Sequence, residues 1–179
     1  MTTKIFFAGF GGQGILFAGK FLAYKGLIEN MYLSWLPSYG PEMRGGTANC
    51  SVTLSDDEPI GSPIFADPDV LVVMNQPSLD KFEDSVVPGG MILVDSTQIA
   101  RKVKRTDVKV FYIPATQMAT DGGMTGLANM ILTGKLIREC SALNAENCQA
   151  ALEKIISARH ADKLELNLSA LKCGLAYEE

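Results

Sequence analysis

The sequence has little of what membrane proteins and nucleic-acid-binding proteins need. Its unbroken apolar stretches are far shorter than the roughly 18 residues that span a bilayer, and it has no basic arm and no run of like charges. Acidic residues outnumber basic ones by 20 to 16, so the net charge is −4, which argues against nucleic acid as a partner. Because Met1–Lys4 leads straight into an apolar segment, we expect no signal peptide and a cytoplasmic location.

Metal-binding and redox motifs are also missing. The four cysteines form no C-x-x-C pair, and the single histidine, His160, falls in a polar connection. We therefore expect buried, reduced thiols, and a chain that by itself holds no metal, no iron–sulfur cluster and no catalytic residue. The cysteines are Cys50, Cys140, Cys148 and Cys173.

What the sequence does contain is glycine at a strand-to-helix junction. Between a strand predicted over Lys4–Ala8 and a helix predicted over Gln13–Ile28, the glycines have the spacing G-x-G-x-x-G. Such glycines let a phosphate approach the backbone, and the first amides of the helix favour an anion by roughly 0.3–1 kcal/mol. Two interpretations stay open: a nucleotide or phosphate site, or a tight turn that binds nothing. The candidate residues are Gly9, Gly11, Gly12, Gln13 and Gly14.

A dinucleotide site would need one further residue that is absent here. In dinucleotide-binding units, an Asp or Glu about 20 residues after the glycines holds the ribose. The second predicted strand, Met31–Leu36, runs into Pro37 and Ser38 with no acidic residue. The nearest arginine that could take a 2′-phosphate is Arg44, which lies beyond a turn. The sequence therefore argues against NAD.

A second unusual stretch is Ser38–Gly46, in which glycines frame a charged pair. If the first two strands are neighbours in the sheet, this loop lies beside the glycine loop. Arg44 is then the candidate contact for a phosphate or a partner chain, and Glu42 orients it. The alternative is a surface turn in which the two charges pair with little effect on stability. The candidate residues of this loop are Ser38, Tyr39, Gly40, Glu42, Arg44 and Gly45.

The middle of the chain predicts an α/β fold. Apolar runs at Asp69–Met74 and Met91–Val94 are typical of strands buried on both faces, and Thr47–Leu54 and Lys109–Ile113 are further predicted strands. Asn75 is a candidate binding residue because it follows a central strand, where open α/β sheets place their ligands.

The last third of the chain is predicted to be helical. The helix around Leu127–Ile137 is apolar on nearly every side, so another helix or another chain must cover it. Stripes of apolar residues later in the chain predict two amphipathic helices that could do so. We expect a single domain over residues 1–179: a three-layer α/β/α, Rossmann-like fold with a mostly parallel central sheet and C-terminal helices.

Several stretches together carry a resemblance to a known family. They are Gly9–Gly14, Ser38–Cys50, Ile60–Pro63 and Asn75–Pro77, and they occur in family order. On these motifs the chain resembles, along essentially its whole length, the gamma subunit of the 2-oxoacid:ferredoxin oxidoreductases. The beta subunit of indolepyruvate oxidoreductase has a similar domain. The length and the Pro-Glu-Met-Arg-Gly-Gly loop resemble the 2-oxoglutarate and branched-chain versions more than the pyruvate version.

The resemblance implies a subunit of a larger enzyme that oxidatively decarboxylates a 2-oxoacid, transfers the acyl group to coenzyme A and reduces ferredoxin. In that family, thiamine diphosphate with Mg is held by the alpha and beta subunits. The iron–sulfur clusters lie in beta or in a ferredoxin-like delta subunit. The gamma chain would then bind no cofactor alone and be inactive in isolation. Two alternatives remain: an independent NADP-type reductase, and a purely structural assembly subunit. Self-association of the isolated chain is also open.

Overall fold

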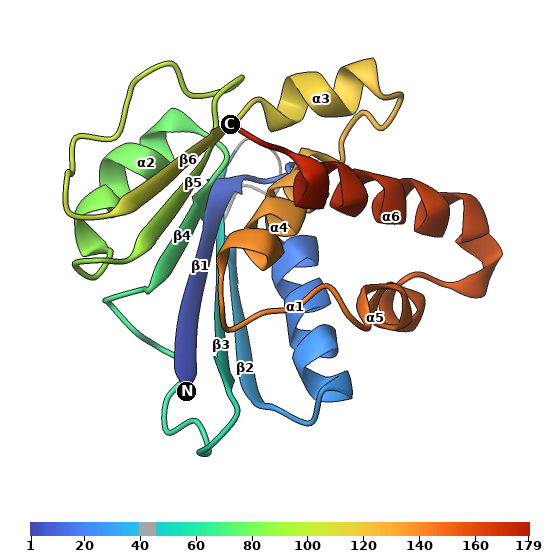
Figure 1. Ribbon diagram of the computed structural model, residues 1–179, viewed down its shortest axis with the longest axis horizontal. Helices are drawn as coiled ribbons and strands as arrows, with labels where there is room; N and C mark the ends of the chain where they lie inside the picture. Colours follow the sequence, from blue (N-terminus) through green and yellow to red (C-terminus); the bar gives the residue numbers. More distant parts are fainter. Residues whose placement is uncertain (40–45) are drawn as a thin grey trace.

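The computed structural model describes residues 1–39 and 46–179, apart from the side chain of Tyr39. In this part of the chain, strands form one sheet in the order β2-β3-β1-β4-β5-β6, with helices packed on it (Figure 1). The strands are β1 (Thr2–Phe10), β2 (Tyr32–Tyr39), β3 (Thr47–Ser55), β4 (Val70–Val73), β5 (Met91–Asp95) and β6 (Lys109–Ile113). The helices are α1 (Ile15–Ile28), α2 (Gln76–Phe82), α3 (Ala115–Asp121), α4 (Ala128–Glu139), α5 (Cys148–Ile155) and α6 (Ala161–Ala176).

The sheet is mostly parallel, as predicted, with β3 as the exception. Strands β1, β4, β5 and β6 pair in parallel, whereas β3 is antiparallel to both β1 and β2. The first two strands, β1 and β2, are therefore not neighbours. The expectation that the two candidate loops lie side by side rested on the condition that these strands were neighbours, and that condition is wrong. The physical reason is that the short connection between β2 and β3 makes a hairpin, and only a longer crossover can join parallel neighbours.

The two loops nevertheless leave the same edge of the sheet. Gly9 near the end of β1 and Tyr39 at the end of β2 both lie in register with Ala48 of β3. The N–H of Gly11 donates to the carbonyl oxygen of Gly46 at 2.9 Å, so the end of the second loop is attached directly to the glycine loop.

Helices cover both faces of the sheet, which confirms the three-layer prediction. On one face α1 and the C-terminal helices enclose the larger core, which includes Phe7, Phe21 and Leu132. On the other face α2 packs on β1 and β4, over a smaller core that includes Leu71 and Leu79. None of the helices in the described residues is both long enough and apolar enough to cross a membrane.

The apolar helix predicted in the last third is α4, and α6 is the element that covers it. Every residue of α4 from Ala128 to Ile137 is buried. The two helices cross with their backbones in close approach: a Cβ on Gly134 would lie 2.1 Å from the carbonyl oxygen of Leu171, and one on Gly174 would lie 1.9 Å from that of Ile131. Glycine at both positions is what lets the helices touch.

Several element boundaries differ from the prediction by a few residues, and two of the differences have a local physical cause. Helix α1 begins at Ile15 and not at Gln13, because Gly14 has a left-handed φ of 76° that an α-helix cannot contain. Strand β2 continues through Pro37 to Tyr39, beyond the predicted end at Leu36. Because β2 lies at the edge of the sheet, one side of the strand has no ladder partner among the described residues, and a proline is tolerated there.

Candidate functional site

The glycine loop is held in shape by the side chain of Gln13. Its Oε1 accepts from the N–H of Phe10 at 2.7 Å, and its Nε2 donates to the carbonyl oxygen of Met74 at 2.9 Å. The main-chain N–H of Gln13 also donates to the carbonyl oxygen of Phe10. Gln13 therefore ties the end of β1 to the end of β4, and its polar atoms are engaged within the protein.

Gly14 is fixed from the other side by Asn129, at the start of α4. The Asn129 Nδ2 donates to the carbonyl oxygen of Gly14 at 3.0 Å, and a Cβ on Gly14 would lie 2.4 Å from that nitrogen. Gly14 thus meets two requirements of glycine, a positive φ and a close neighbour. Asn129 is 3% exposed, and its Oδ1 has no hydrogen-bond partner among the described residues.

Some amides of the loop remain available to a ligand or a partner chain. Within the described part of the chain, the N–H groups of Gly12 and Gly14 donate to no protein acceptor. The first N–H groups of α1, from Ile15 onward, have no partner within their own helix and carry the positive end of its dipole. No acidic residue lies in the first turn of α1, so this positive end is not neutralised from within the helix.

Two small hollows flank the loop. One, of about 240 Å³, is lined by Phe10, Gly11 and the first turn of α1. The other, of about 220 Å³, lies between the loop, Met74 and the start of α3, where Thr116 is among its lining residues. Among the described residues, no charged side chain lines either hollow. They offer main-chain amides, hydroxyl groups and carboxamides, which suit the neutral parts of a ligand.

Thr116 is itself held by a buried carboxylate. Asp95, at the end of β5, is fully buried; it accepts from the Thr116 hydroxyl at 2.5 Å and from the N–H groups of Thr97 and Thr116. This network fixes the wall of the second hollow.

Asn75 lies at the end of β4 and begins α2. Its Oδ1 accepts from the N–H of Ser78 at 2.8 Å, which is the usual role of an N-cap side chain. Its Nδ2 is buried without a partner among the described residues. Asn75 does not line either hollow beside the glycine loop.

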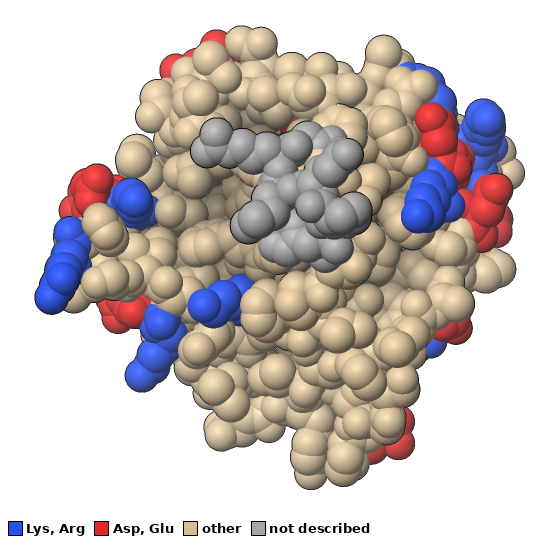
Figure 2. Space-filling model, turned by 180° about the vertical axis from the view of Figure 1, so that it is seen from behind, with Lys and Arg blue, Asp and Glu red and all other residues tan. Residues whose placement is uncertain are grey.

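The second predicted loop is described only at its two ends. Ser38 is exposed near the end of β2, and Tyr39 is the last residue of that strand. Gly40, Glu42, Arg44 and Gly45 lie outside the described residues. Figure 2 shows the molecule from behind: the described surface around the residues drawn in grey is mostly uncharged, and acidic and basic side chains lie mainly toward the rim. This agrees with the absence of charged residues from β2 and β3.

The cysteines are free and lie apart from one another. Cys50 on β3 lies beneath the first turn of α1, where its Sγ donates to the carbonyl oxygen of Ile15. Burial raises the pKa of the Cys50 thiol to about 12, against smaller opposing effects of the neighbouring Trp35 side chain and Gly19 main chain. The thiol is therefore protonated at neutral pH and is no nucleophile. The described residues contain no group of three or more His, Cys, Asp or Glu side chains that could hold a metal ion.

Asn129 and the Asp95–Thr116 pair were missed in the sequence. Asn129 stands within the apolar helix and was passed over because its neighbours dominate the pattern. A lone carboxamide inside an all-round apolar helix is itself a signal, since a buried polar group needs a partner. Asp95 follows a buried strand just as Asn75 does, and the same position in the sheet could have identified it.

Comparison with known proteins now supplies the family. Residues 4–177 match the family described as pyruvate ferredoxin/flavodoxin oxidoreductase. The chain belongs to this family. It is 40% identical over 172 residues to ketoisovalerate oxidoreductase subunit VorA of Methanothermobacter thermautotrophicus, covering 96% of this chain and 35% of that protein. It is 36% identical to 2-oxoglutarate synthase subunit KorC of Methanocaldococcus jannaschii, covering 85% of this chain and 82% of that protein. This family member thus spans about a third of VorA and most of KorC.

Solved structures of the family share the fold. The gamma subunit of a keto/oxoacid ferredoxin oxidoreductase from Geobacter sulfurreducens superposes with a TM-score of 0.80 at 25% identity, covering 96% of this chain and 95% of that one. The 2-oxoglutarate:ferredoxin oxidoreductase of Magnetococcus marinus, solved with 2-oxoglutarate, coenzyme A and succinyl-CoA bound, gives a TM-score of 0.87 at 23% identity, covering 98% of this chain and 30% of that one. At 23% identity, the likeness to the Magnetococcus marinus enzyme shows a shared fold only.

Proposed function

We propose that this chain is the gamma subunit of a multisubunit 2-oxoacid:ferredoxin oxidoreductase. The complex would oxidatively decarboxylate a 2-oxoacid, transfer the acyl group to coenzyme A and pass the electrons to ferredoxin. The family match over residues 4–177 carries the proposal. The proposed substrate of the complex is 2-oxoglutarate, since the KorC relatives are matched along most of their length. The VorA relatives, at higher identity, make ketoisovalerate the second candidate.

The geometry of the sheet speaks against an independent dinucleotide-binding reductase. In dinucleotide-binding units the ribose is held at the end of the strand that follows the first helix, parallel to β1 and next to it. Here the antiparallel strand β3 occupies that place and β2 is one strand further out. Within the described residues, the sheet therefore has no parallel strand next to β1 on that side whose end could hold a ribose beside the glycine loop.

The cofactors of such a complex would be held by other chains. Thiamine diphosphate needs Mg with oxygen ligands, and iron–sulfur clusters need several thiolates. The described residues bring neither set together, and the thiol of Cys50 is buried and protonated. The proposed partners are accordingly alpha and beta subunits and, where present, a ferredoxin-like delta subunit.

The contact that this chain would make with coenzyme A or with a partner lies at the glycine-loop edge of the sheet. The available amides of Gly12, Gly14 and the first turn of α1 suit a phosphate. The end of the second loop is joined to them through the Gly11–Gly46 hydrogen bond. Arg44, two residues before Gly46, is the side chain proposed to complete an anion site, and Glu42 the one proposed to orient it.

A substitution in the reconstituted complex tests the role of Arg44. Arg44→Ala is expected to raise the apparent Kd for coenzyme A by about ten- to a hundredfold, since charge-assisted hydrogen bonds contribute about 1.5–3 kcal/mol. Arg159→Ala, an exposed arginine far along the chain, is the matched control and should leave the Kd unchanged. An unchanged Kd in an intact Arg44→Ala complex would remove Arg44 from the binding role. Failure of the chain to co-purify with thiamine-containing subunits would reject the gamma-subunit assignment itself.

A further inference from the structure

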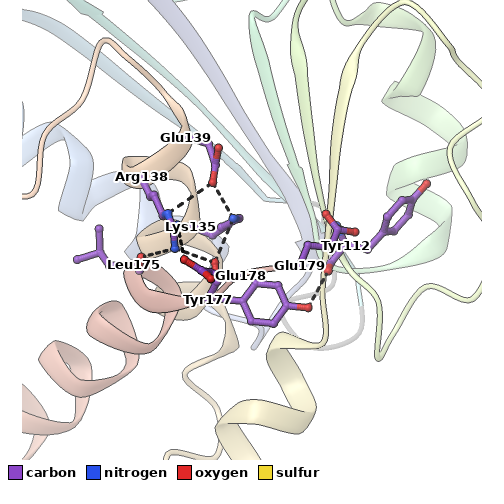
Figure 3. Close-up of polar contacts among 8 residues, drawn as sticks. All are labelled: Tyr112, Lys135, Arg138, Glu139, Leu175, Tyr177, Glu178 and Glu179. Carbon is purple, nitrogen blue, oxygen red and sulfur yellow. Dashed lines mark hydrogen bonds and ion pairs between the residues drawn. The ribbon is translucent and has the colours of Figure 1, made fainter.

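The segment that follows α6 crosses the edge of the sheet that β6 forms, opposite the edge that β2 forms. Tyr177, Glu178 and Glu179 leave the end of α6 and lie against β6 and α4 (Figure 3). We call these three residues the clasp. Strand β6 is the last strand in the sheet order, so one side of it has no strand partner in the described residues.

The clasp occupies that open side through main-chain groups of Tyr112. The N–H of Tyr112 donates to Oε1 of Glu179, and its carbonyl oxygen accepts from the phenol of Tyr177, both at 3.3 Å. These are the groups that a further strand would use to extend the sheet. The clasp thus stands where another strand would pair.

Two cations of α4 hold the clasp in place. The ammonium of Lys135, which is 3% exposed, donates to the carbonyl oxygen of Tyr177 at 3.1 Å and to Glu139 at 2.6 Å. Arg138 donates to the carbonyl oxygens of Leu175 and Tyr177 and to the carboxylate of Glu178. The contact of Arg138 with Leu175 also satisfies one of the last carbonyl oxygens of α6, which have no partner within that helix.

The strand beneath the clasp is one that would pair readily if left open. Val110–Ile113 of β6 is a run of β-branched and aromatic residues without charge. Exposed, uncharged edge strands of this composition associate with other strands unless something blocks them. Lys109 is the one charged residue of the strand.

We propose that the clasp is a guard on the β6 edge: closed, it keeps the sheet from growing, and released, it lets β6 pair with β6 of a second copy of this chain. The occupant is a second copy because two identical strands can pair antiparallel about a two-fold axis, and the uncharged run Val110–Ile113 meets no like charge when it does so.

The test reverses the two acidic charges of the clasp. In the full chain, Glu178→Lys places a lysine opposite Arg138, and Glu179→Lys removes the carboxylate that accepts from the N–H of Tyr112, so the double substitution should open the clasp. Hydrogen exchange in the peptide containing residues 109–113 is expected to accelerate roughly tenfold. Light scattering after size exclusion should show the mass rising from monomer toward dimer with concentration. The control, Glu146→Lys with Glu165→Lys, makes the same change of charge at exposed positions away from β6 and should alter neither measurement.

A second variant keeps the proposal testable if the double lysine variant does not fold. Tyr177→Phe removes only the phenol hydroxyl that donates to the carbonyl oxygen of Tyr112, and it should accelerate the same exchange by a smaller factor. Unchanged exchange in both variants would show that the clasp does not hold the edge. Faster exchange with a mass that stays monomeric at high concentration would overturn the guard role. Wild-type chain that already dimerises through β6 would overturn it as well.

Discussion

Single side chains give the glycine loop its shape. Gln13 closes the loop with two hydrogen bonds, and Asn129 fixes Gly14 from a helix more than a hundred residues later in the chain. The loop therefore presents a fixed set of amides to whatever lies at this edge of the sheet. Preorganised donors of this kind bind an anion with little loss of conformational entropy on binding.

The two requirements on Gly14 can be separated by mutation. Gly14→Ala forces a side chain into a left-handed φ and against Asn129, whereas Gly12→Ala, at a φ of 96°, meets no atom of the described residues within 4 Å. Gly12→Ala is expected to lower the free energy of unfolding by about 1–2 kcal/mol. Gly14→Ala should lower it by a further 1–3 kcal/mol or so because of the clash. Urea denaturation of the two variants measures the difference.

A double-mutant cycle checks that the clash is with Asn129. Asn129→Ala in the Gly14→Ala background removes the opposing amide, so the combined cost should fall short of the sum of the single costs by about 1 kcal/mol or more. Strict additivity would mean that the extra cost at Gly14 arises elsewhere.

At the scale of elements, the sequence pattern predicted those helices and strands that residues close together in the sequence determine. The buried strands β4 and β5 were found because unbroken apolar runs report burial on both faces, and α4 because its apolar residues surround it. The order β2-β3-β1 was not found, since nothing within β2 specifies whether the next strand pairs as a hairpin or crosses over. The start of α1 was misplaced by two residues because a left-handed glycine and a helical one look alike in a sequence. At the site, the partners of Gln13 and Gly14 come from Met74 and Asn129. A carboxamide in an apolar helix signals that Asn129 needs a partner, but no local pattern says which distant residue that partner is.

The crossing of α4 and α6 makes a prediction against helix propensity. Alanine is favoured over glycine in helices by about 1 kcal/mol, so propensity alone predicts that Gly174→Ala stabilises the protein. Because the new Cβ would lie 1.9 Å from the carbonyl oxygen of Ile131, we expect the reverse, a loss of about 3 kcal/mol as the helices are forced apart. Thermal unfolding gives the sign directly.

The matched control is Gly26→Ala in α1, where the nearest atom is a methyl group of Leu54 at 2.7 Å. The Leu54 side chain can rotate away, whereas the backbone of α4 cannot, so this variant should change stability far less. Equal losses in the two variants would show that close backbone approach is not what makes Gly174 necessary.

At the scale of the whole molecule, a buried carboxylate joins the α2 side of the sheet to the rest of the chain. Glu83, which follows α2, accepts from the N–H groups of Lys104 and Arg105 and pairs with Arg101 at 2.8 Å. It thereby attaches the α2 layer to the segment that leads into β6. The stability of this layer should therefore depend on pH.

The titration of Glu83 fixes the direction of that dependence. Burial alone would raise its pKa, but the N–H donors of Lys104 and Arg105 and the Arg101 guanidinium outweigh burial and leave the pKa below its ordinary value. A carboxyl whose pKa is lower in the folded chain stabilises the fold above the unfolded pKa, near 4.3 for Glu, and loses that effect as the pH falls through the folded pKa.

Glu83→Gln should therefore lower the free energy of unfolding by about 1–3 kcal/mol at pH 7. Below about pH 4 the gap between the variant and the wild type should narrow as the wild-type carboxylate is protonated. Urea denaturation at pH 7 and pH 3 measures both gaps, with the exposed Glu165→Gln as the control that should differ little from wild type at either pH. A gap that stays constant between the two pH values would mean that the charge of Glu83 contributes nothing to holding the α2 layer.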